Sequence, residues 1–458
     1  MRASSSKHVG SFTGGRRWGA TAGVLGVAGL AVGQLAAAAQ AASPGGTGSL
    51  APYTATRLSS LAVNGDTNPY SIAVVPISAG KLVAGNVLAV DFNHAGTAGA
   101  GKSIVQVNPS TGATSAFASG LPISGPVGIA INPVNDGVWI GGFGSVDGSN
   151  SNDLLILPDG TVKANYNATS VHAKPGYAGV KPTFDGVWGE GVSKHAGQVS
   201  FYYGTTGSGA TGGGGGQLWR IDPHPTGVPN GQPVNSTYAQ IATGLAGNAT
   251  AKALPVAAAN AAGPQGFAYD NASGILYVAN DANNTITAVP GAAGATGPVV
   301  TRNLPVAARI LNVPENIALD PTNGDLLAVN AGTNTLVELN PSTGAVVGSR
   351  LLDTGAKGAL FGLAVTTDAQ GKLVIFYGND NDNTLNVLRA SASTPAAGTP
   401  GASTAPSAGQ PTGSVPTSVQ AGSGGQAAAE GFPVTLVTLL GTGGLLATLV
   451  GVRRFARR

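Results

Sequence analysis

The chain has 458 residues, of which 42% are hydrophobic and 9% charged, with 72 glycines and 29 prolines. This composition excludes a mainly helical protein, because Glu and Lys are scarce, and it excludes global disorder, because there is enough apolar material for a core. The absence of cysteine excludes disulfides, thiolate metal sites and thiol catalysis. The net charge of +3 is concentrated at the two ends of the chain, which argues against a nucleic-acid-binding surface.

The first 41 residues have the organisation of a signal peptide. A polar, basic start is followed by an apolar run that ends in small residues, and Ala39-Gln40-Ala41 has the pattern of a cleavage site. The pair Arg16-Arg17 leaves twin-arginine export open beside general secretion, and an uncleaved anchor helix is a further alternative. We therefore predict a signal peptide over 1–41 and a short linker over 42–52.

A short block recurs along 53–389: Pro, any residue, a small or polar residue, an apolar residue, then Ala or Trp. Each copy is followed by two further segments rich in β-branched and aromatic residues, so each repeat predicts three strands separated by turns. The spacing between copies, roughly 45 to 60 residues apart from one longer interval, is typical of four-stranded blades. The copies begin at Pro69, Pro126, Pro182, Pro264 and Pro314, and a sixth copy, 360–364, lacks the proline.

Two features extend this repeat into a closed fold. The turn Asn-Pro-Ser-Thr-Gly-Ala occurs twice at the same phase, at 108–113 and 340–345. The segment 53–63 precedes the first repeat and has the composition of a strand. Because the sixth repeat has only three strands and an open edge is a liability, we expect 53–63 to supply its outer strand. The sequence therefore predicts an all-β, six-bladed β-propeller, or seven blades if the insertion between 204 and 250 contains another.

The repeat resembles a known family. The blocks Gly-Pro-x-Gly-[Phe/Ile]-Ala-x-[Asp/Asn], [Ile/Leu]-x-Val and Asn-[Asn/Thr]-x-[Ile/Leu], of which 263–289 contains one set, are similar to the NHL and YVTN repeats of exported bacterial β-propellers. The resemblance covers 53–389 and implies the fold. It does not imply an activity, because this fold carries scaffolds, lyases, lactonases and redox enzymes alike.

The C-terminal part predicts a membrane anchor. Residues 390–431 are almost wholly Ala, Ser, Thr, Pro, Gly and Gln, which favours a flexible stalk without a core. The apolar run 432–452 is long enough to span a bilayer as a helix, and the basic tail 453–458 favours a cytoplasmic C-terminus. We therefore expect a single-pass cell-membrane protein with the propeller outside. A sortase-type tail is the alternative, but no Leu-Pro-x-Thr-Gly precedes the run.

Asn/Asp turns after the second strands, at 280–281, 330 and 379–383, are the most suggestive polar residues. Oxygen ligands on a loop suit Ca²⁺, yet Asn and Asp are also the best formers of tight left-handed turns. Because the same Asn recurs at the same phase, the turn role is favoured.

An enzyme of the calcium-dependent lactonase type remains the alternative that the resemblance implies. Such an enzyme would place Glu, Asn and Asp residues around the central channel. Asp185 and Glu190 could join such a site. The metal-ligand candidates are Glu315, Asn316, Asp380 and Asp382.

No other catalytic constellation is visible in the sequence. The histidines 94, 172, 195 and 224 lie in separate loops without metal-ligand spacing, and aromatic residues such as Trp188 and Trp219 lie in strands and favour packing roles. We therefore expect a surface-displayed, membrane-anchored binding module for a protein or glycan ligand. The sequence leaves enzymatic activity open but favours its absence, and Ca²⁺ is the one cofactor that it leaves open. The alternatives are a calcium-dependent esterase or lactonase and a structural cell-envelope protein.

Overall fold

The computed structural model describes residues 46–62, 64–144, 150–172, 181–207, 215–224, 235–247 and 262–391. All of them belong to the second of two units into which the chain divides, Ser43–Arg458. The predicted signal peptide, the apolar run 432–452, the basic tail and nearly all of the predicted stalk lie outside these residues. Within the described ranges, no helix has the length and apolar character needed to cross a bilayer.

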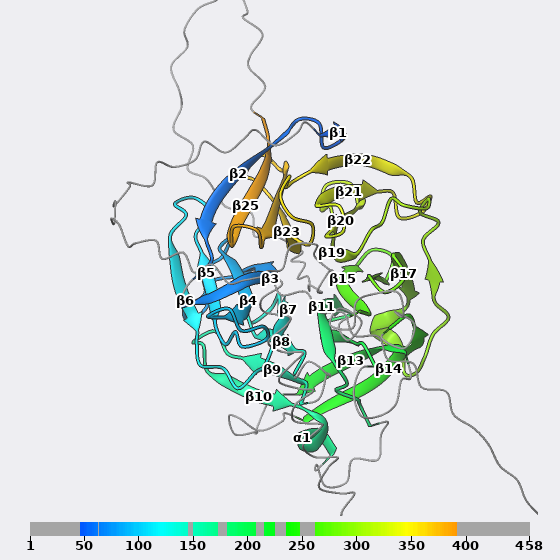
Figure 1. Cartoon of the computed structure of the whole chain (residues 1–458). Coiled ribbons are helices and arrows are strands. Elements are labelled where there is room, and N and C mark those ends of the chain that lie inside the picture. Colours follow the sequence, from blue (N-terminus) through cyan, green and yellow to red (C-terminus); the bar gives the residue numbers. More distant parts are fainter. Residues whose placement is uncertain are drawn as a thin grey trace, which may run out of the picture. The chain divides into compact units, whose positions relative to one another are not determined.

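The described residues form six antiparallel sheets arranged in a ring (Figure 1). The inner strand of each sheet contacts the inner strands of the sheets before and after it in the chain, and the last contacts the first, so the ring is closed. The fold is therefore an all-β, six-bladed β-propeller, as the repeat spacing predicts. In order from blade 1 to blade 6, the inner strands are β3 (Asp66–Val74), β7 (Pro126–Ile131), β11 (Val187–His195), β15 (Pro264–Asp270), β19 (Pro314–Leu319) and β23 (Leu360–Thr367).

The strands of blades 1 to 4, the first four strands of blade 5 and the first three of blade 6 follow chain order from the axis outwards. The second strands are β4 (Val87–His94), β8 (Val138–Gly142), β12 (Gln198–Thr205), β16 (Ile275–Asn280), β20 (Leu326–Asn330) and β24 (Leu373–Asn379). The third strands are β5 (Ile104–Val107), β9 (Asn152–Ile156), β13 (Gly216–His224), β17 (Thr285–Pro290), β21 (Thr335–Leu339) and β25 (Thr384–Ala390). The outer strands of blades 1 to 5 are β6 (Thr114–Ala118), β10 (Val162–Tyr166), β14 (Asn235–Leu245), β18 (Arg302–Asn303) and β22 (Val346–Leu351). The helical segments are α1 (Ala168–His172) and η1 (Ala292–Gly294).

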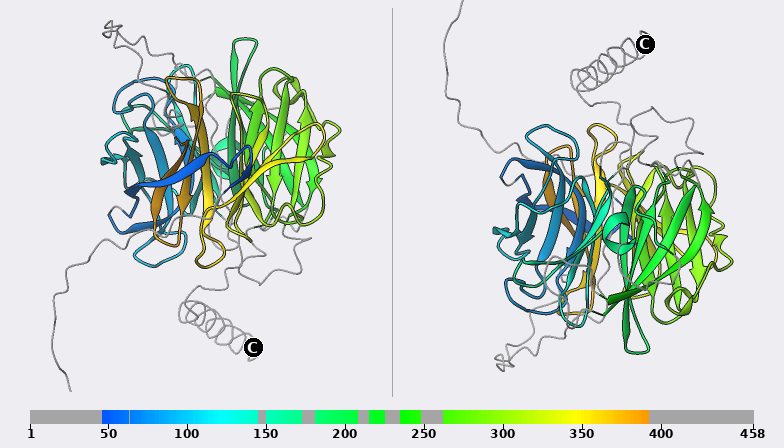
Figure 2. Two further views of the ribbon diagram at one scale, coloured as in Figure 1. Left: turned by 90° about the horizontal axis from the view of Figure 1, so that it is seen from above. Right: turned by 90° about the horizontal axis from the view of Figure 1, so that it is seen from below.

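Blade 6 is completed from the start of the propeller. Strand β2 (Tyr53–Ser60) pairs along β25, from Tyr53 against Ala390 to Ser60 against Thr384. This confirms the expectation that a segment ahead of the first repeat supplies the missing outer strand. Figure 2 shows the ring edge-on, with β2 in blue beside β25 in orange. The short β1 (Thr47–Gly48) adds a fifth strand to the edge of blade 5.

Turn chemistry explains why the repeat ends its strands where it does. In both copies of Asn-Pro-Ser-Thr-Gly-Ala, the Asn side chain accepts a hydrogen bond from the backbone of the residue two positions later, at 2.9 Å in one copy and 3.1 Å in the other. The glycines, Gly112 and Gly344, have φ values of 71° and 69°, a left-handed conformation that glycine adopts without a steric penalty. The same six residues therefore build the same turn between the third and outer strands of blades 1 and 5.

The third copy of the repeat begins later than its sequence pattern predicts. Val187, not Pro182, pairs with the last residue of the second strand, Thr205, just as Pro264 pairs with Asn280 in blade 4. The proline had marked the start because it matches the pattern of the other copies. With the corrected phase, Trp188 is equivalent to Gln265 of blade 4, and Glu190 is equivalent to Phe267.

Candidate functional site

The register between the inner and second strands shifts by one residue after the first pair in blades 2 to 6 and after the Pro69–Asp91 pair in blade 1. Such a bulge re-aims a side chain, and bulges are common next to functional sites. The inner-strand residues that directly follow these pairs are all buried, with exposures of 3% or less. In blade order they are Tyr70, Val127, Trp188, Gln265, Glu315 and Phe361.

Three of these side chains meet although they come from blades 1, 3 and 6. The ring of Tyr70 stacks on Phe361 with centroids 4.5 Å apart, and it meets Trp188 edge-on at 5.7 Å. Blades 1, 3 and 6 are not all neighbours in the ring, and they come together only at its axis. The residues at the bulges therefore converge at the axis. Phe92 and Phe143, from blades 1 and 2, join the same apolar cluster. We call these five aromatic residues the aromatic plug.

The other side of the axis is polar. At the bulge position, blades 4 and 5 carry Gln265 and Glu315. A second position shows the same division: the residue after the second-strand member of the pair at the bulge is Phe92 in blade 1 and Phe143 in blade 2, but Asp281 in blade 4 and Asp380 in blade 6. The charges of Glu315, Asp281 and Asp380, together with burial as the larger cause, raise the pKa of Tyr70 well above its usual value. The charges of all three carboxyl groups therefore act on the Tyr70 phenol.

Burial perturbs these acids strongly. It raises the pKa of Asp281 to about 7, although the Gly263 amide donates a hydrogen bond to its Oδ1 at 2.7 Å and Gln265 donates another. Burial alone raises the pKa of Asp380 to about 7. The pKa of Asp91, at the end of β4, is raised well above its usual range by burial and by the charges of Asp66 and Asp380. Shifts of this kind, caused by desolvation and like charge, are typical of functional sites.

The axial acids have no cationic partner in the described part of the chain. The ion pairs found there are Arg57 with Asp382, His94 with Asp66, and Arg220 with Asp222, so Asp91, Asp281 and Asp380 have none. Both carboxylate oxygens of Asp91 and the hydroxyl of Tyr70 are buried without a hydrogen-bond partner among the described residues. Buried polar groups without partners are rare in native proteins and point to a bound water, ion or ligand group. We call Asp91, Asp281, Glu315 and Asp380 the axial carboxyls.

The predicted metal-ligand candidates divide between two places. Glu315 and Asp380 belong to the axial carboxyls. Asn316 follows Glu315, is fully buried, and its side-chain amide has no partner in the described residues. Asp382 lies at the surface, where it accepts a hydrogen bond from Thr384 at 2.5 Å and forms an ion pair with Arg57 at 3.8 Å. No group of three or more Asp, Glu or His residues among the described ranges is placed to hold a metal ion, and the calcium site stays a prediction.

The recurring Asn of the second strands has the architectural role that its repetition indicates. In blades 4, 5 and 6 its Nδ2 donates to the link that enters the blade, at Ala246 O (2.9 Å), Ile310 O (3.1 Å) and Asp353 Oδ2 (2.8 Å). The left-handed turn residues are Asn284, Asn334 and Asn383. The following aspartates, Asp281 and Asp380, are different, because they approach the axis. Sequence reasoning had grouped them with the turns, and the contrast with Phe92 and Phe143 at the same phase is the signal that separates them.

A second pair of buried acids lies between blades 2 and 3. Glu190, on β11, is joined by a hydrogen bond to Asp153, on β9, and both side chains are fully buried. Burial raises both pKa values, and the Asp153 charge raises that of Glu190 further, so the two carboxyl groups share a proton. Gly141 makes room for the pair, since a Cβ there would lie 2.6 Å from Glu190 Oε1. Glu190 thus belongs to this pair.

The other five blade interfaces have apolar residues at the two positions of this acid pair. They are Ile129 with Ile104, Phe267 with Leu218, Ile317 with Ile286, Leu363 with Leu336, and Ile72 with Leu385, and both members always belong to one apolar cluster. The acid pair therefore replaces an apolar contact on both sides at once.

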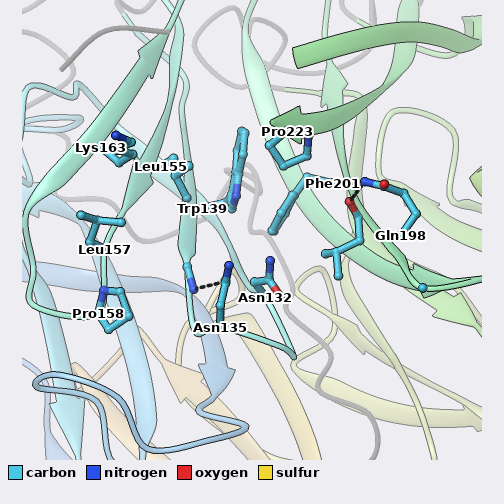
Figure 3. A pocket seen from close by; sticks show the side chains of 13 residues that line it. Asn132, Asn135, Trp139, Leu155, Leu157, Pro158, Lys163, Gln198, Phe201 and Pro223 are labelled. Atoms are coloured by element: carbon cyan, nitrogen blue, oxygen red, sulfur yellow. Dashed lines mark hydrogen bonds between the residues drawn. The ribbon is translucent and has the colours of Figure 1, made fainter. Parts of the chain in front are cut away.

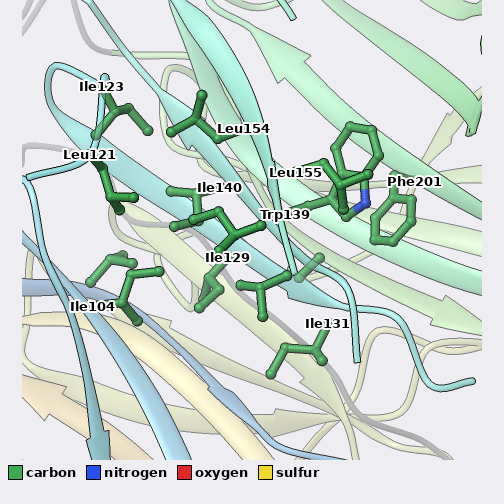
Figure 4. Close-up of a cluster of buried hydrophobic side chains, with 14 of the residues drawn as sticks. Ile104, Leu121, Ile123, Ile129, Ile131, Trp139, Ile140, Leu154, Leu155 and Phe201 are labelled. Carbon is green, nitrogen blue, oxygen red and sulfur yellow. The ribbon is translucent and has the colours of Figure 1, made fainter. Parts of the chain in front are cut away.

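The opposite end of the ring has a cleft between blades 2 and 3, with a volume of about 400 Å³ (Figure 3). Asn135, Gln198 and Lys163 contribute its polar groups. Trp139 also lines it, but its ring is stacked between Tyr166 and Phe201, at 4.9 and 4.4 Å, and is fully buried. Figure 4 shows the same Trp139 within a large apolar cluster. Because both faces of the indole are covered, Trp139 is a core residue and not a platform for a sugar ring.

The remaining polar contact of note is at the edge of blade 1. His94 Nδ1 lies 2.6 Å from Asp66 Oδ1, and the other oxygen of Asp66 accepts a hydrogen bond from Ser103. The aspartate stands between the serine and the histidine, so the imidazole does not contact the hydroxyl as a nucleophile's base must. This arrangement orients His94 and does not activate Ser103.

No known protein-family profile matches the chain, and no curated protein matches it in sequence. Solved structures with similar chain traces include a gluconolactonase from Xanthomonas campestris, with 14% identity over 76% of this chain and 98% of that chain and a TM-score of 0.43. The PQQ-bound aldose sugar dehydrogenase from Streptomyces coelicolor has 16% identity over 73% and 98% and a TM-score of 0.42. A luciferin-regenerating enzyme has 11% identity over 73% and 94% and a TM-score of 0.44. Similarities this low carry no argument about the site, and the six-bladed fold rests on the strand pairing above.

Proposed function

We propose that this protein is an exported binding module that takes a positively charged ligand group at the axial carboxyls. The observation that carries the proposal is that Asp91, Asp281 and Asp380 are buried without a cation among the described residues, while Asp281 and Asp380 both act on Tyr70 and Asp380 also acts on Asp91. Burying a carboxylate without a partner is costly, and the raised pKa values express that cost. A bound cation would offset it, so these groups favour a cationic ligand.

An organic ammonium or guanidinium group suits this site better than a metal ion. The acids are contributed by four blades, and no three of the described Asp, Glu or His residues are placed to share one ion. An amine or guanidinium with several N–H donors could reach separate carboxylates. The ligand class is therefore a small amine or a basic side chain of a partner protein.

The cellular setting of the proposal comes from the sequence. The signal peptide, the stalk 390–431, the helix 432–452 and the basic tail would hold the propeller outside the cell membrane. In this proposal, the blades are NHL- or YVTN-type repeats of an exported bacterial protein. Protease treatment of intact cells should remove the propeller and leave a tag at the C-terminus protected. A propeller that resists protease until the cells are broken would overturn the export proposal.

A calcium-dependent esterase or lactonase is the second candidate, because Glu315 lies at the axis and the buried Asn316 amide beside it has no partner in the described residues. The two candidates differ in the cation that binds. We would measure the melting temperature of the full chain with arginine amide, putrescine or calcium chloride, since a ligand that binds only the folded state raises it. A shift with the amines supports the binding module, and a shift with calcium alone supports the enzyme. No shift with any of the three would overturn the axial site.

A further inference from the structure

A second cleft, of about 440 Å³, lies between blades 4 and 5 at the end of the ring where the inner strands begin. Its walls are the turn between β16 and β17 and the link from β18 to β19. No acidic residue lines it, and its one charged side chain is that of Arg309, which is exposed and has no ion-pair partner in the described residues. The lining residues are Asn283, Asn284, Val306, Ala307, Ala308, Arg309, Leu311 and Asn312.

Two asparagines of the cleft use their side-chain oxygens in internal hydrogen bonds and leave their amide nitrogens without partners among the described residues. Asn283 Oδ1 accepts the hydroxyl of Thr285 at 2.7 Å, and Asn284 Oδ1 accepts the backbone N–H of Val313 at 2.6 Å. A backbone N–H must meet an oxygen, so the second contact fixes which way the Asn284 amide points. Their Nδ2 groups have no partner within the described ranges. With the guanidinium of Arg309, these two amide groups therefore offer N–H donors at the cleft.

The link that carries Arg309 is held in an unusual backbone conformation. Val313 has a φ of 53° and Arg309 a φ of 72°, although a left-handed conformation is strongly disfavoured for a β-branched residue. Backbone hydrogen bonds to blade 5 hold the segment, from Ala331 N to Val313 O at 2.9 Å and from Gly332 N to Asn312 O at 3.1 Å. Strain of this kind persists only where the surroundings impose it, and it clusters at ligand sites. The cleft is thus built before any ligand arrives.

We propose that this cleft binds the oxyanion of a small organic acid, a carboxylate or a phosphate ester, through the Arg309 guanidinium and the amide nitrogens of Asn283 and Asn284. Arginine presents paired N–H groups that match two oxygens of either anion, and charge-assisted bonds of this kind are the strong ones. The site goes beyond the proposed function, because its ligand has the opposite charge to that of the axial site. Anionic and cationic probes therefore test the two sites separately.

The test is calorimetric titration of the full chain at low ionic strength with succinate, glycerol 3-phosphate and glycerol. The proposal expects saturable binding of at least one of the two anions and none of glycerol, and the tighter anion identifies the ligand class. Arg309→Gln should weaken binding by about tenfold or more. Arg302→Gln is the matched control, because Arg302 is an exposed arginine of the same blade that does not line the cleft, and it should leave binding unchanged.

A second variant, Asn283→Ala, allows the proposal to be tested even if the Arg309→Gln variant does not fold. Asn283→Ala removes an amide donor on the turn and should weaken binding by about threefold, since one neutral hydrogen bond contributes less than a charged one. Unfolding curves of each variant establish that the fold is retained. Absence of saturable binding of both anions by the unaltered chain would overturn the proposal, as would equal affinity of the Arg309→Gln variant. If that variant does not fold, unchanged affinity of the Asn283→Ala variant would overturn it instead.

Discussion

The molecule buries two groups of carboxylic acids, and it treats them differently. Between blades 2 and 3, Asp153 and Glu190 face each other and share a proton. Around the axis, Asp281 and Asp380 lie apart, with pKa values raised to about 7 by burial and with no cation among the described residues. The two acids of the first group stabilise each other, whereas those of the second group do not. Buried acids therefore have a structural role between blades 2 and 3. Around the axis, the buried acids still need a positively charged group to compensate for their burial.

The acid pair also shows how a repeat accepts a polar substitution. At the other five interfaces an apolar residue of one blade meets an apolar residue of the next. Replacing only one member by an acid would bury a carboxyl group against carbon, which is costly. Replacing both, beside Gly141, lets each acid satisfy the other. Asp91, Asp281 and Asp380 have no cationic partner among the described residues.

The largest expected difference in stability is between variants that each remove one acid, one from each group. Glu190→Ala leaves Asp153 without its partner and leaves a cavity, so the free energy of unfolding should fall by about 3 kcal/mol or more. Asp380→Ala removes a desolvated carboxyl group that no protein group stabilises, and the change at pH 7 should stay within about 1 kcal/mol. Urea unfolding measures both variants. Equal losses would remove the distinction between the two groups.

The pH dependence of stability should identify the axial acids. The folded pKa of Asp380, about 7, lies above that of an unfolded aspartate, so its contribution is fully present below about pH 4 and is lost as the pH rises towards 7. The loss approaches about 1.4 kcal/mol per pH unit for one proton. Asp380→Asn should remove this slope, which unfolding curves at several pH values would reveal. A variant with the slope of the unaltered chain would show that Asp380 does not titrate there.

Replacement of Glu190 by its uncharged amide, glutamine, should be tolerated at neutral pH. Because the pair shares one proton, Glu190→Gln keeps a donor towards Asp153 and should change the free energy of unfolding by less than about 1 kcal/mol. The matched variant is Asp153→Asn, which places the neutral amide on the other member of the pair. Thermal unfolding at pH 7 compares the two. A loss of stability with both variants as large as that with Glu190→Ala would contradict a shared proton.

The smallest effect is expected at Asp382. Its ion pair with Arg57 is partly exposed, and pairs of this kind contribute less than about 0.5 kcal/mol in most proteins. Asp382→Ala should therefore leave both stability and cation binding nearly unchanged. Weaker binding of calcium or of an amine by this variant, measured by calorimetry, would return Asp382 to the ligand site.

Much of the fold could be predicted from the sequence, because each blade repeats the same local chemistry. The recurring proline, the Asn/Asp turns and the strand-like segment 53–63 each have one structural role, and the ring closes as they indicate. The third blade was out of phase because Pro182 matches the pattern without beginning the pairing. Residues in a link are not constrained by a partner strand, so a matching proline there carries no information on register.

The site could be predicted only in part. Glu315 was identifiable as an acid at the start of an inner strand, and Asp380 as a member of a polar turn. That Asp281 and Asp380 turn to the axis, opposite the aromatic plug, depends on register between strands that are distant in sequence. The partnership of Glu190 with Asp153 depends on how two blades meet. Contacts across blades are invisible to a repeat pattern that describes one blade at a time.

The axial site would be tested most directly by calorimetric titration of arginine amide into the full chain at pH 6 and at pH 8. Because Asp281 and Asp380 have pKa values of about 7, they lose their protons between these values, and carboxylates attract the cation more strongly than neutral acids. The account predicts affinity about tenfold or more higher at pH 8, and loss of this gain in a variant with both Asp281→Asn and Asp380→Asn. Affinity that is equal at the two pH values, or that the double variant retains, would contradict it.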